Sequence, residues 1–262
     1  MPTRPPILPV SYSRAHRAHE PSRPEQRTEQ LTRLDIFPVD GLPEIGRGDD
    51  IAAMICDAVE LVDGDIVIVT QKIISKAEGK IVEIDATDPL SHKPLVEQES
   101  VRILRRRGEL IISETKHGFV CANAGIDLSN VERGTAALLP DDSDRSARRI
   151  RDRIRGRFGV GVGVIISDTF GRPWRRGVTD VAIGSAGVQV ILDLRGTPDA
   201  LGREMQVTEV ALVDELASAA ELVMGKSTGI PVAIIRGGPA EWLGESNVRE
   251  DIVRAPSDDL FR

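Results

Sequence analysis

Residues 163–177 constrain the fold of this chain more than any other segment. They begin with the apolar run Gly163-Val164-Ile165-Ile166-Ser167, continue with Asp168 and Thr169, and end in a loop that contains glycine, proline and three arginines. A short β-branched run of this kind predicts a buried strand, here over residues 160–167. A carboxylate and a hydroxyl at a strand end can hold a hard divalent cation, and the arginines can clamp phosphate or carboxylate oxygens. The segment therefore predicts a metal–nucleotide site, with an ordinary strand end and an Asp-Thr turn as the alternative.

The composition narrows the classes of protein without choosing one. The 262 residues carry a net charge of -7, which argues against a general nucleic-acid binder, and only 3% are aromatic, which disfavours a platform for single-stranded bases. No apolar run approaches the roughly 20 residues that cross a membrane, and the N-terminus lacks the apolar core of a signal peptide. Cys56 and Cys121 show no metal-binding spacing and are interpreted as small buried hydrophobes, so we expect a protein of the reducing cytoplasm.

The patterning divides the chain into three parts. Residues 1–31 are rich in proline and arginine and predict a disordered extension, residues 32–254 predict a folded domain, and residues 255–262 predict a tail or linker. Strands and helices mix throughout the domain, which predicts an α/β or mixed α+β class without the regular alternation of a doubly wound sheet. The expected strands are residues 33–39, 65–70, 81–84, 110–113, 160–167, 178–183, 188–194 and 231–236. The expected helices run from a cap at Asp49 or Asp50 to Val59, over residues 94–107, from a Ser143 cap to Arg157, and, as the longest, over residues 206–224.

Two further polar segments can contribute to a site. In the first, Gly125 allows close approach of the backbone to a ligand, Asp127 is a candidate second metal carboxylate, and Asn130 is a candidate donor to phosphate or ribose. The alternative there is an Asx-type turn. In the second, Gln71 and Lys76 follow a buried strand, where ligands often meet the ends of strands. Its alternative is a solvated loop.

The run Met224-Gly225-Lys226-Ser227-Thr228 resembles a phosphate-binding P-loop only superficially. That motif needs a glycine five residues before Gly225, and Ala220 stands there. The pattern favours a helix that ends at Gly225, with Lys226 still able to face a phosphate. The arginine run of residues 145–157 favours a solvated helix face, with an anionic-substrate face as the alternative. No Ser-His-Asp or Cys-His arrangement is evident, which weakens histidine-dependent hydrolysis or acyl transfer.

Several segments, taken in order along the chain, resemble one known family. They are Leu42-Pro43-Glu44-Ile45, residues 70–79, residues 124–131, residues 167–175, and Met224-Gly225-Lys226 ahead of residues 229–232. This order is similar to the coenzyme F-420-0:L-glutamate ligase family, the γ-glutamyl ligases of the deazaflavin hydride carrier. The resemblance covers roughly residues 33–255, and the third and fourth segments carry most of its specificity.

The resemblance implies a particular reaction and architecture. Members of the family use GTP and Mn²⁺ or Mg²⁺, with K⁺ as a further ion, to join L-glutamate to coenzyme F-420-0 and then to add γ-linked glutamates. The implied fold is a two-part mixed α/β structure that forms an intertwined homodimer, with two interleaved subdomains in residues 32–254. Some actinobacterial relatives fuse the ligase to a nitroreductase-like flavin domain, and we expect a single ligase domain here.

The resemblance also implies roles for individual residues. Asp127 and Asp168 would be metal ligands, and Thr169 would ligate a second metal. The residues implied in guanine nucleotide binding are Leu42, Pro43, Glu44, Ile45, Gln71, Lys76, Asn130, Gly225 and Lys226. Some archaeal relatives carry a glutamine near the Lys226 position as a metal contact, and a protonated lysine cannot ligate a cation.

Charge and location alone suggest a role for the arginine loop. Arg172, Arg175 and Arg176 are candidates to hold the anionic acceptor or the carboxylates of glutamate. Two rival functions use the same site: a metal-dependent nucleotide phosphohydrolase, and a guanine-nucleotide-binding regulatory module without turnover. Neither rival needs a second anionic substrate, so the arginine-rich loop favours the ligase.

Overall fold

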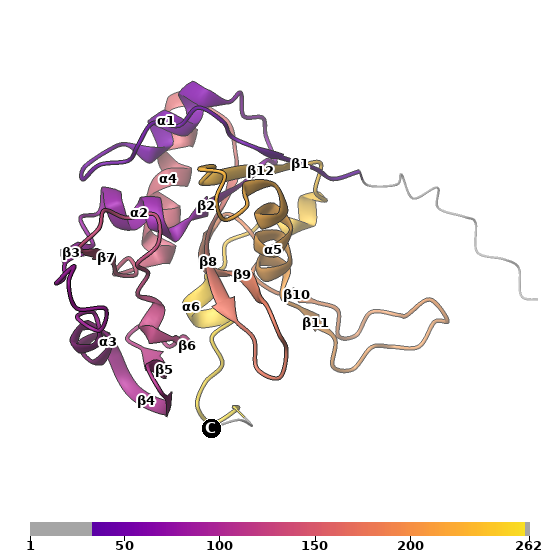
Figure 1. Ribbon diagram of the computed structural model, residues 1–262. Coiled ribbons are helices and arrows are strands. Elements are labelled where there is room, and N and C mark those ends of the chain that lie inside the picture. Colours follow the sequence, from indigo (N-terminus) through magenta and orange to yellow (C-terminus); the bar gives the residue numbers. More distant parts are fainter. Residues whose placement is uncertain (1–32, 260–262) are drawn as a thin grey trace, which may run out of the picture. The chain divides into compact units, whose positions relative to one another are not determined.

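The strand predicted over residues 65–70 lies at the centre of a five-stranded sheet in the computed structural model, which describes residues 33–259. The predicted extension, residues 1–31, and the last three residues of the predicted tail lie outside the described residues. The strand order is β1-β12-β2-β8-β9, in which β2 and β8 run parallel and every other pair is antiparallel (Figure 1). The mixed α/β class is confirmed.

The strands in chain order are β1 (Asp35–Pro38), β2 (Ile66–Thr70), β3 (Ile81–Glu83), β4 (Ser100–Arg107), β5 (Leu110–Thr115), β6 (Val120–Ala122), β7 (Thr135–Ala137), β8 (Gly163–Gly171), β9 (Val178–Ala186), β10 (Leu192–Asp193), β11 (Glu209–Val210) and β12 (Val232–Arg236). The helices are α1 (Ile51–Ala58), α2 (Gln71–Ala77), α3 (Lys93–Glu99), α4 (Ser143–Phe158), α5 (Leu212–Met224) and α6 (Val248–Asp251), with short 3₁₀ turns η1 (Asn123–Gly125) and η2 (Ala240–Trp242).

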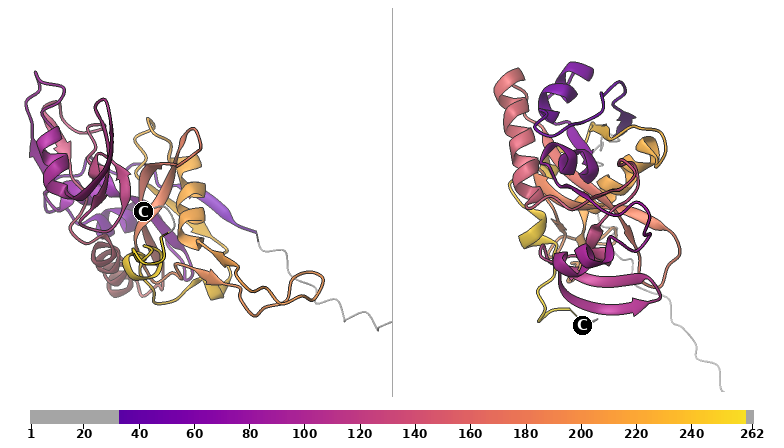
Figure 2. Two further views of the ribbon diagram at one scale, coloured as in Figure 1. Left: turned by 90° about the horizontal axis from the view of Figure 1, so that it is seen from below. Right: turned by 60° about the vertical axis from the view of Figure 1, so that its left-hand side comes forward.

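The central strands are buried on both faces. Both β2 and β12 are runs of valine and isoleucine with alanine or threonine, and their residues are buried except at the last position. Helix α4 packs on β8 and β9 with α1 beside it, and α5 covers the opposite face (Figures 1 and 2). Because helices cover both faces, the strands need no polar side and appear as continuous apolar runs.

The parallel pairing of β2 and β8 determines where the polar residues meet. Thr70, the last residue of β2, lies opposite Ser167 in β8. The chain then turns directly into α2 from β2, while β8 continues through Asp168 and Thr169. The first turn of α2 and the Asp168 segment therefore lie at the edge formed by the carboxyl ends of β2 and β8, where ligand sites are expected in open α/β sheets.

A second, smaller apolar cluster lies beyond this edge. It contains Val96 of α3, Ile111 of β5, and Ala124, Ile126 and Ala136. Around it are the antiparallel pair β3–β7 and the three-stranded sheet β4-β5-β6. An isolated bridge pairs Asp127 with Ala137, which fixes the backbone at the predicted metal carboxylate.

Helix ends follow elementary capping chemistry, with one correction. Asp50 caps α1 by accepting a hydrogen bond from the Ala53 backbone N–H at 3.2 Å. The predicted Ser143 cap of α4 is wrong: Asp142 is the cap, with its carboxylate 2.8 Å from the Arg145 nitrogen. Gly225 follows the end of α5 with a φ of 63°, a conformation that glycine adopts without strain.

Two predicted helices are wrong in part. The helix expected over residues 94–107 ends at Glu99, and Ser100–Arg107 form β4. Antiparallel pairing with β5 overrides a periodicity that fits either structure in so short a window. The helix expected over residues 206–224 begins at Leu212, because Glu209–Val210 pair with Leu192–Asp193. At 13 residues α5 is also shorter than α4, which has 16.

Strand boundaries also differ from expectation at the site. Residues 71–77 form helix α2, so the solvated-loop alternative is wrong. Strand β8 begins at Gly163 and continues to Gly171, so Asp168 and Thr169 lie within the strand and not at its end. Only two residues of the strand expected over 188–194 pair, as β10, although Val188 and Val190 are buried. Between residues 33 and 259, no helix combines the length and apolar character that crossing a membrane requires.

Candidate active site

Three carboxylates and two lysines gather around β8. Asp168 lies on the strand, Asp127 follows η1, Asp180 lies on β9, Lys72 is in the first turn of α2 and Lys226 follows α5. The cluster is assembled from segments far apart in the sequence. Because neighbouring residues of a strand point to opposite faces, Asp168 is separated from Ser167 and Thr169. We call the two halves the Asp168 face and the Asp180 face.

The Asp168 face contains two carboxyl groups: Asp127 forms an ion pair with Lys72, and Asp168 forms none among the described residues. Lys72 Nζ lies 2.8 Å from Asp127 Oδ2 and 3.0 Å from Ser129 Oγ. The Ser129 backbone N–H donates to Asp127 Oδ1 at 2.7 Å. Burial opposes the charged form of Asp127, but these hydrogen bonds outweigh it and lower its pKa. Asp127 is therefore ionised and anchored, with Lys72 as its counter-ion.

Asp168 responds to its surroundings in the opposite direction. Burial raises the pKa of its carboxyl to about 7, with the nearby Asp127 and Asp180 carboxylates adding to the rise. Lys72 and a backbone hydrogen bond from Thr169 counteract this only partly. The same carboxyl helps to hold the pKa of the buried Cys121 thiol at about 12, after burial itself. The favourable contacts of Asp168 are thus too weak to offset its burial and the negative charges of Asp127 and Asp180.

The Asp180 face is closed by hydrogen bonds. Asp180 is only 3% exposed; its Oδ2 accepts from Ser167 Oγ at 3.1 Å and its Oδ1 from Thr169 Oγ1 at 2.7 Å. Lys226 Nζ also lies 2.7 Å from Asp180 Oδ1 and donates to Thr169 Oγ1. Burial alone would lower the pKa of Lys226, but the hydrogen bonds and negative charges of Asp180 and Glu221 together outweigh it and raise that pKa. This face therefore carries its own cation.

The donor set fits a metal on one face only. Asp127 and Asp168 offer two carboxylates, a number typical of Mg²⁺ sites that take their remaining ligands from phosphate and water. Within residues 33–259 no three histidine, cysteine or acidic side chains gather as a complete metal-binding set, so such an ion would take its remaining ligands from water or a substrate. A divalent cation would offset the burial and the neighbouring carboxylates that raise the pKa of Asp168. Thr169, by contrast, is engaged by Asp180 and Lys226.

The structure brings together some of the residues expected at a nucleotide. Glu44, in the loop before α1, forms an ion pair with Lys76 in the last turn of α2. Ile45 of the same loop is buried, whereas Pro43 is exposed and Leu42 packs against the core. The ion pair therefore joins this loop to α2, the helix that carries Lys72 in its first turn.

Gln71 and Asn130, two other residues expected at the nucleotide, differ in exposure. The Gln71 side chain is 0% exposed, and Ser75 Oγ lies 2.8 Å from its Oε1 and 2.6 Å from the Leu138 carbonyl. Its amide nitrogen has no hydrogen-bond partner in the described part of the chain. Asn130 is exposed and has a φ of 55°, a conformation that asparagine tolerates better than most residues. The Asn130 side chain is available to a ligand, whereas that of Gln71 is internal.

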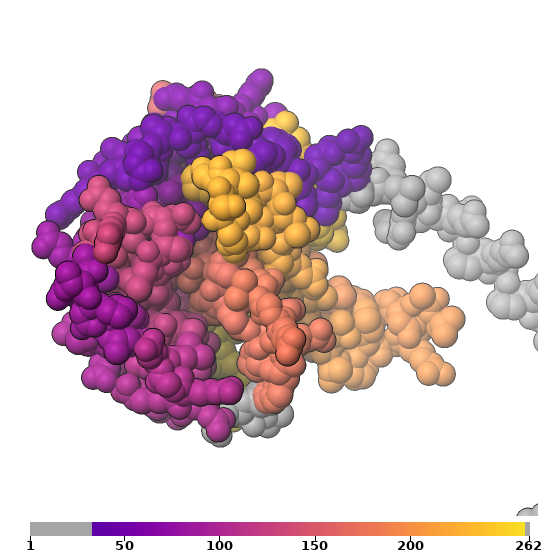
Figure 3. All heavy atoms as spheres, viewed as in Figure 1, coloured from indigo at the N-terminus to yellow at the C-terminus, as the bar shows by residue number. Residues whose placement is uncertain are grey.

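The predicted arginine clamp lies at the tip of the β8–β9 hairpin. Arg172, Arg175 and Arg176 are exposed, and Arg172 Nη2 donates to the Arg176 carbonyl at 2.9 Å. No carboxylate among residues 33–259 pairs with any of the three. Arg172 is four positions after Asp168, a span of roughly 13 Å at about 3.3 Å per residue. These arginines can therefore meet a part of a long substrate that is remote from the carboxylates. Figure 3 shows this hairpin on the same face of the molecule as the segment after α5.

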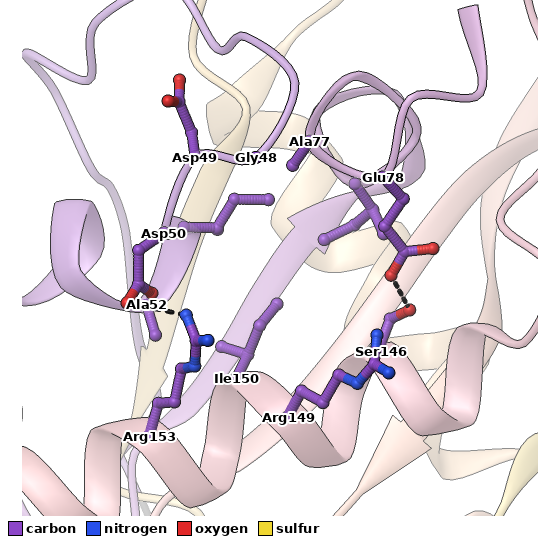
Figure 4. Close-up of a pocket in the computed structure, with 12 residues that line it drawn as sticks. Gly48, Asp49, Asp50, Ala52, Ala77, Glu78, Ser146, Arg149, Ile150 and Arg153 are labelled. Carbon is purple, nitrogen blue, oxygen red and sulfur yellow. Dashed lines mark hydrogen bonds and ion pairs between the residues drawn. The ribbon is translucent and has the colours of Figure 1, made fainter.

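A cavity of about 250 Å³ elsewhere on the domain contains none of the predicted site residues. It lies between the start of α1, the end of α2 and α4 (Figure 4). Arg153 pairs with Asp50 across one wall at 2.7 Å, and Ser146 donates to Glu78 on another. Acidic and basic side chains alternate around it, so it offers no single charge to a ligand.

Sequence reasoning missed Lys72, Asp180 and Ser167. Asp180 did carry a signal, because an acid within a predicted buried strand needs a partner. Lys72 stands next to the expected Gln71, and its pairing with Asp127 depends on contacts between distant segments. No local pattern indicates that pairing.

Comparisons with known proteins agree with the resemblance. Residues 41–237 match the model of the family described as F420-0:Gamma-glutamyl ligase. The chain is 44% identical over 250 residues to the coenzyme F420:L-glutamate ligase of Methanopyrus kandleri, covering 88% of this chain and 99% of that protein. It is 43% identical over 249 residues to that of Methanothermobacter thermautotrophicus, with 87% and 99% coverage, and 42% identical over 245 residues to that of Archaeoglobus fulgidus, with 88% and 97%. The chain belongs to the F420-0:γ-glutamyl ligase family.

Proposed function

We propose that this chain is a ligase that adds L-glutamate to coenzyme F-420-0, and then further γ-linked glutamates, at the expense of GTP. The observation that carries the proposal is family membership, together with an Asp127–Asp168 carboxylate pair suited to a cation that also binds phosphate. Relatives 42–44% identical to this chain carry the name coenzyme F420:L-glutamate ligase.

The chemistry requires activation of a carboxylate, because a free carboxylate and an amine do not form an amide unaided. In the proposed route, an acceptor carboxylate oxygen attacks the γ-phosphorus of GTP, which releases GDP and leaves an acyl phosphate. The amine of L-glutamate then attacks the acyl carbon, the C–O bond to phosphate breaks, and inorganic phosphate and a proton leave. No protein nucleophile is needed in either step.

The chain's residues would bind and orient these reactants. Asp127 and Asp168 would hold Mn²⁺ or Mg²⁺, which when bound supplies positive charge to the phosphate oxygens. Glu44 and Lys76 would fix the loop against which the nucleotide lies. Positioning of this kind accounts for much of the rate in phosphoryl transfer.

The arginine loop would hold the other substrates. Arg172 and Arg175 project from the hairpin tip without carboxylate partners among the described residues, so they can bind the anionic acceptor or glutamate. In this arrangement the long acceptor spans the hairpin, with its reacting end at the carboxylate pair. Charge reversal in Arg175→Glu should therefore raise the KM for the acceptor while leaving the KM for GTP unchanged.

A mass-resolved assay tests the proposal. The purified chain is incubated with GTP, Mn²⁺, L-glutamate and coenzyme F-420-0, beside Asp168→Ala and the control Asp141→Ala, whose carboxylate lies in an exposed pair with Lys80. We expect the acceptor to grow by glutamate units with matching release of GDP, in the wild type and the control only. GTP loss without acceptor growth would indicate a phosphohydrolase, and nucleotide binding without turnover a regulatory module; both contradict the ligase.

A further inference from the structure

The ammonium group of Lys226 lies close to three side-chain oxygens, although the side chain is half-exposed. Its nitrogen lies 2.7 Å from Asp180 Oδ1, 3.2 Å from Glu221 Oε1 and within hydrogen-bond distance of Thr169 Oγ1. A lysine ammonium has three N–H donors and no acceptor. Hydrogen bonds to Asp180 and Thr169 and an ion pair with Glu221 therefore supply three oxygens to its three donors.

Both carboxylate oxygens of Asp180 are already engaged by groups of the protein. Its side chain is 3% exposed, and both carboxylate oxygens already accept hydrogen bonds, from Ser167 on one side and from Thr169 and Lys226 on the other. A divalent ion at Thr169 would have to displace an ammonium from a buried carboxylate, or lie against it and be repelled. The position that the resemblance assigns to a second metal is thus already occupied by charge from the chain.

The Asp168 face provides the contrast. Lys72 engages Asp127 there, but no lysine or arginine among residues 33–259 forms an ion pair with Asp168. Each face has two carboxylates and one ammonium, but the contacts differ. On the Asp180 face both carboxylates, Asp180 and Glu221, pair with Lys226, whereas on the Asp168 face only Asp127 pairs with Lys72. Among these four carboxylates, Asp168 is therefore the one without an ion pair in the described part of the chain.

We propose that Lys226 is the built-in cation of the Asp180 face, so that this chain binds a divalent ion on the Asp168 face alone. Lys226 is then a positioning residue: it holds Thr169 of β8 against Asp180 of β9, and its ammonium supplies the positive charge that a second metal would bring. The single-ion part of this inference rests on the proposed function, whereas the role of Lys226 does not.

Counting bound Mn²⁺ tests the inference without any assay of activity. The full chain is dialysed to equilibrium against Mn²⁺ without nucleotide, and bound metal is measured by atomic absorption. We expect one ion per chain in the wild type and two in Lys226→Gln, because the amide opens the Thr169–Asp180 position and supplies an oxygen ligand. Lys226→Arg, which keeps the charge, and Lys116→Gln, which removes a lysine paired with Glu99 elsewhere, should both stay at one.

A second variant covers the case in which Lys226→Gln does not fold. Thr169→Val in the otherwise unchanged chain should leave the number of bound ions as it is, since Thr169 holds no metal. Loss of an ion in Thr169→Val, or equal counts in the wild type and a folded Lys226→Gln, would overturn the inference. A count of zero in the wild type and one in Lys226→Gln would support the role of Lys226 and contradict the metal site of the proposed function.

Discussion

The two lysine–aspartate pairs around β8 differ in which partner is buried. In the Lys72–Asp127 pair the lysine side chain is 17% exposed and the carboxylate 31%, whereas in the Lys226–Asp180 pair the lysine is 52% exposed and the carboxylate 3%. A buried carboxylate without its partner is costly, while a partly exposed one can be solvated. The comparison indicates that Asp127 can exchange its lysine for another cation, and that Asp180 depends on the one it has.

The difference indicates that one face of the cluster suits ligand binding and the other suits stabilisation of the fold. The Asp168 face combines an exchangeable counter-ion with an uncompensated carboxyl, which suits reversible binding of a charged ligand. The Asp180 face ties β8 to β9 and to the segment after α5, which suits a fixed frame. Variants on the two faces should therefore affect different measurements.

Asp127→Asn should have the largest effect, and on activity only. A bound cation lowers the barrier of phosphoryl transfer by several kcal/mol, and each 1.36 kcal/mol of barrier changes the rate tenfold. Loss of the cation should therefore reduce turnover on the order of 10³-fold. The midpoint of urea unfolding should barely move, since the amide still accepts from Ser129. Steady-state assays beside urea titrations measure both, and a large loss of stability would break the comparison.

Asp180→Ala should have the next largest effect, on stability. It leaves Ser167, Thr169 and Lys226 without their shared acceptor, which should lower the free energy of unfolding by about 3 kcal/mol, the low end for a broken buried pair because Lys226 is half-exposed. Asp127→Ala should lower it by less, because Ser129 Oγ still accepts a hydrogen bond from Lys72. Equal losses in the two variants, measured by guanidinium unfolding, would remove the distinction between the faces.

Lys72→Met should strengthen Mn²⁺ binding. A +1 and a +2 charge about 5 Å apart repel by roughly 1.7 kcal/mol even in water, so removing the ammonium should tighten binding about tenfold. Isothermal titration calorimetry gives the affinity. Weaker binding would mean that Lys72 supports the ion and does not compete with it for Asp127.

Removing the Lys76–Glu44 ion pair should have the smallest effect on stability. Glu44 is 84% exposed, and exposed pairs contribute about 0–1 kcal/mol to stability. Glu44→Gln should therefore leave the free energy of unfolding nearly unchanged, while raising the KM for GTP through loss of the fixed loop. A stability loss comparable to that of Asp180→Ala would show that exposure is a poor guide to these lysine pairs.

The sequence alone determined the core and one half of the site. The β-branched runs of β2, β8 and β12 predicted buried strands because an element covered on both faces must be apolar throughout. The order of short motifs indicated the family, and the Asp-Thr pair indicated a site. The helix expected over residues 94–107 was partly wrong because only pairing with β5 distinguishes β4 from a helix.

Only the tertiary structure decided how charge is compensated within the site. Lys226 and Asp180 are separated by 46 residues, and Lys72 and Ser129 by 57, so no local pattern links them. Electrostatic interactions depend on distance and burial, which the parallel pairing of β2 with β8 and the packing of α5 establish. The sequence predicted Asp127 and Asp168, whereas the fold added Asp180 and determined which of the three carboxylates already pairs with a lysine.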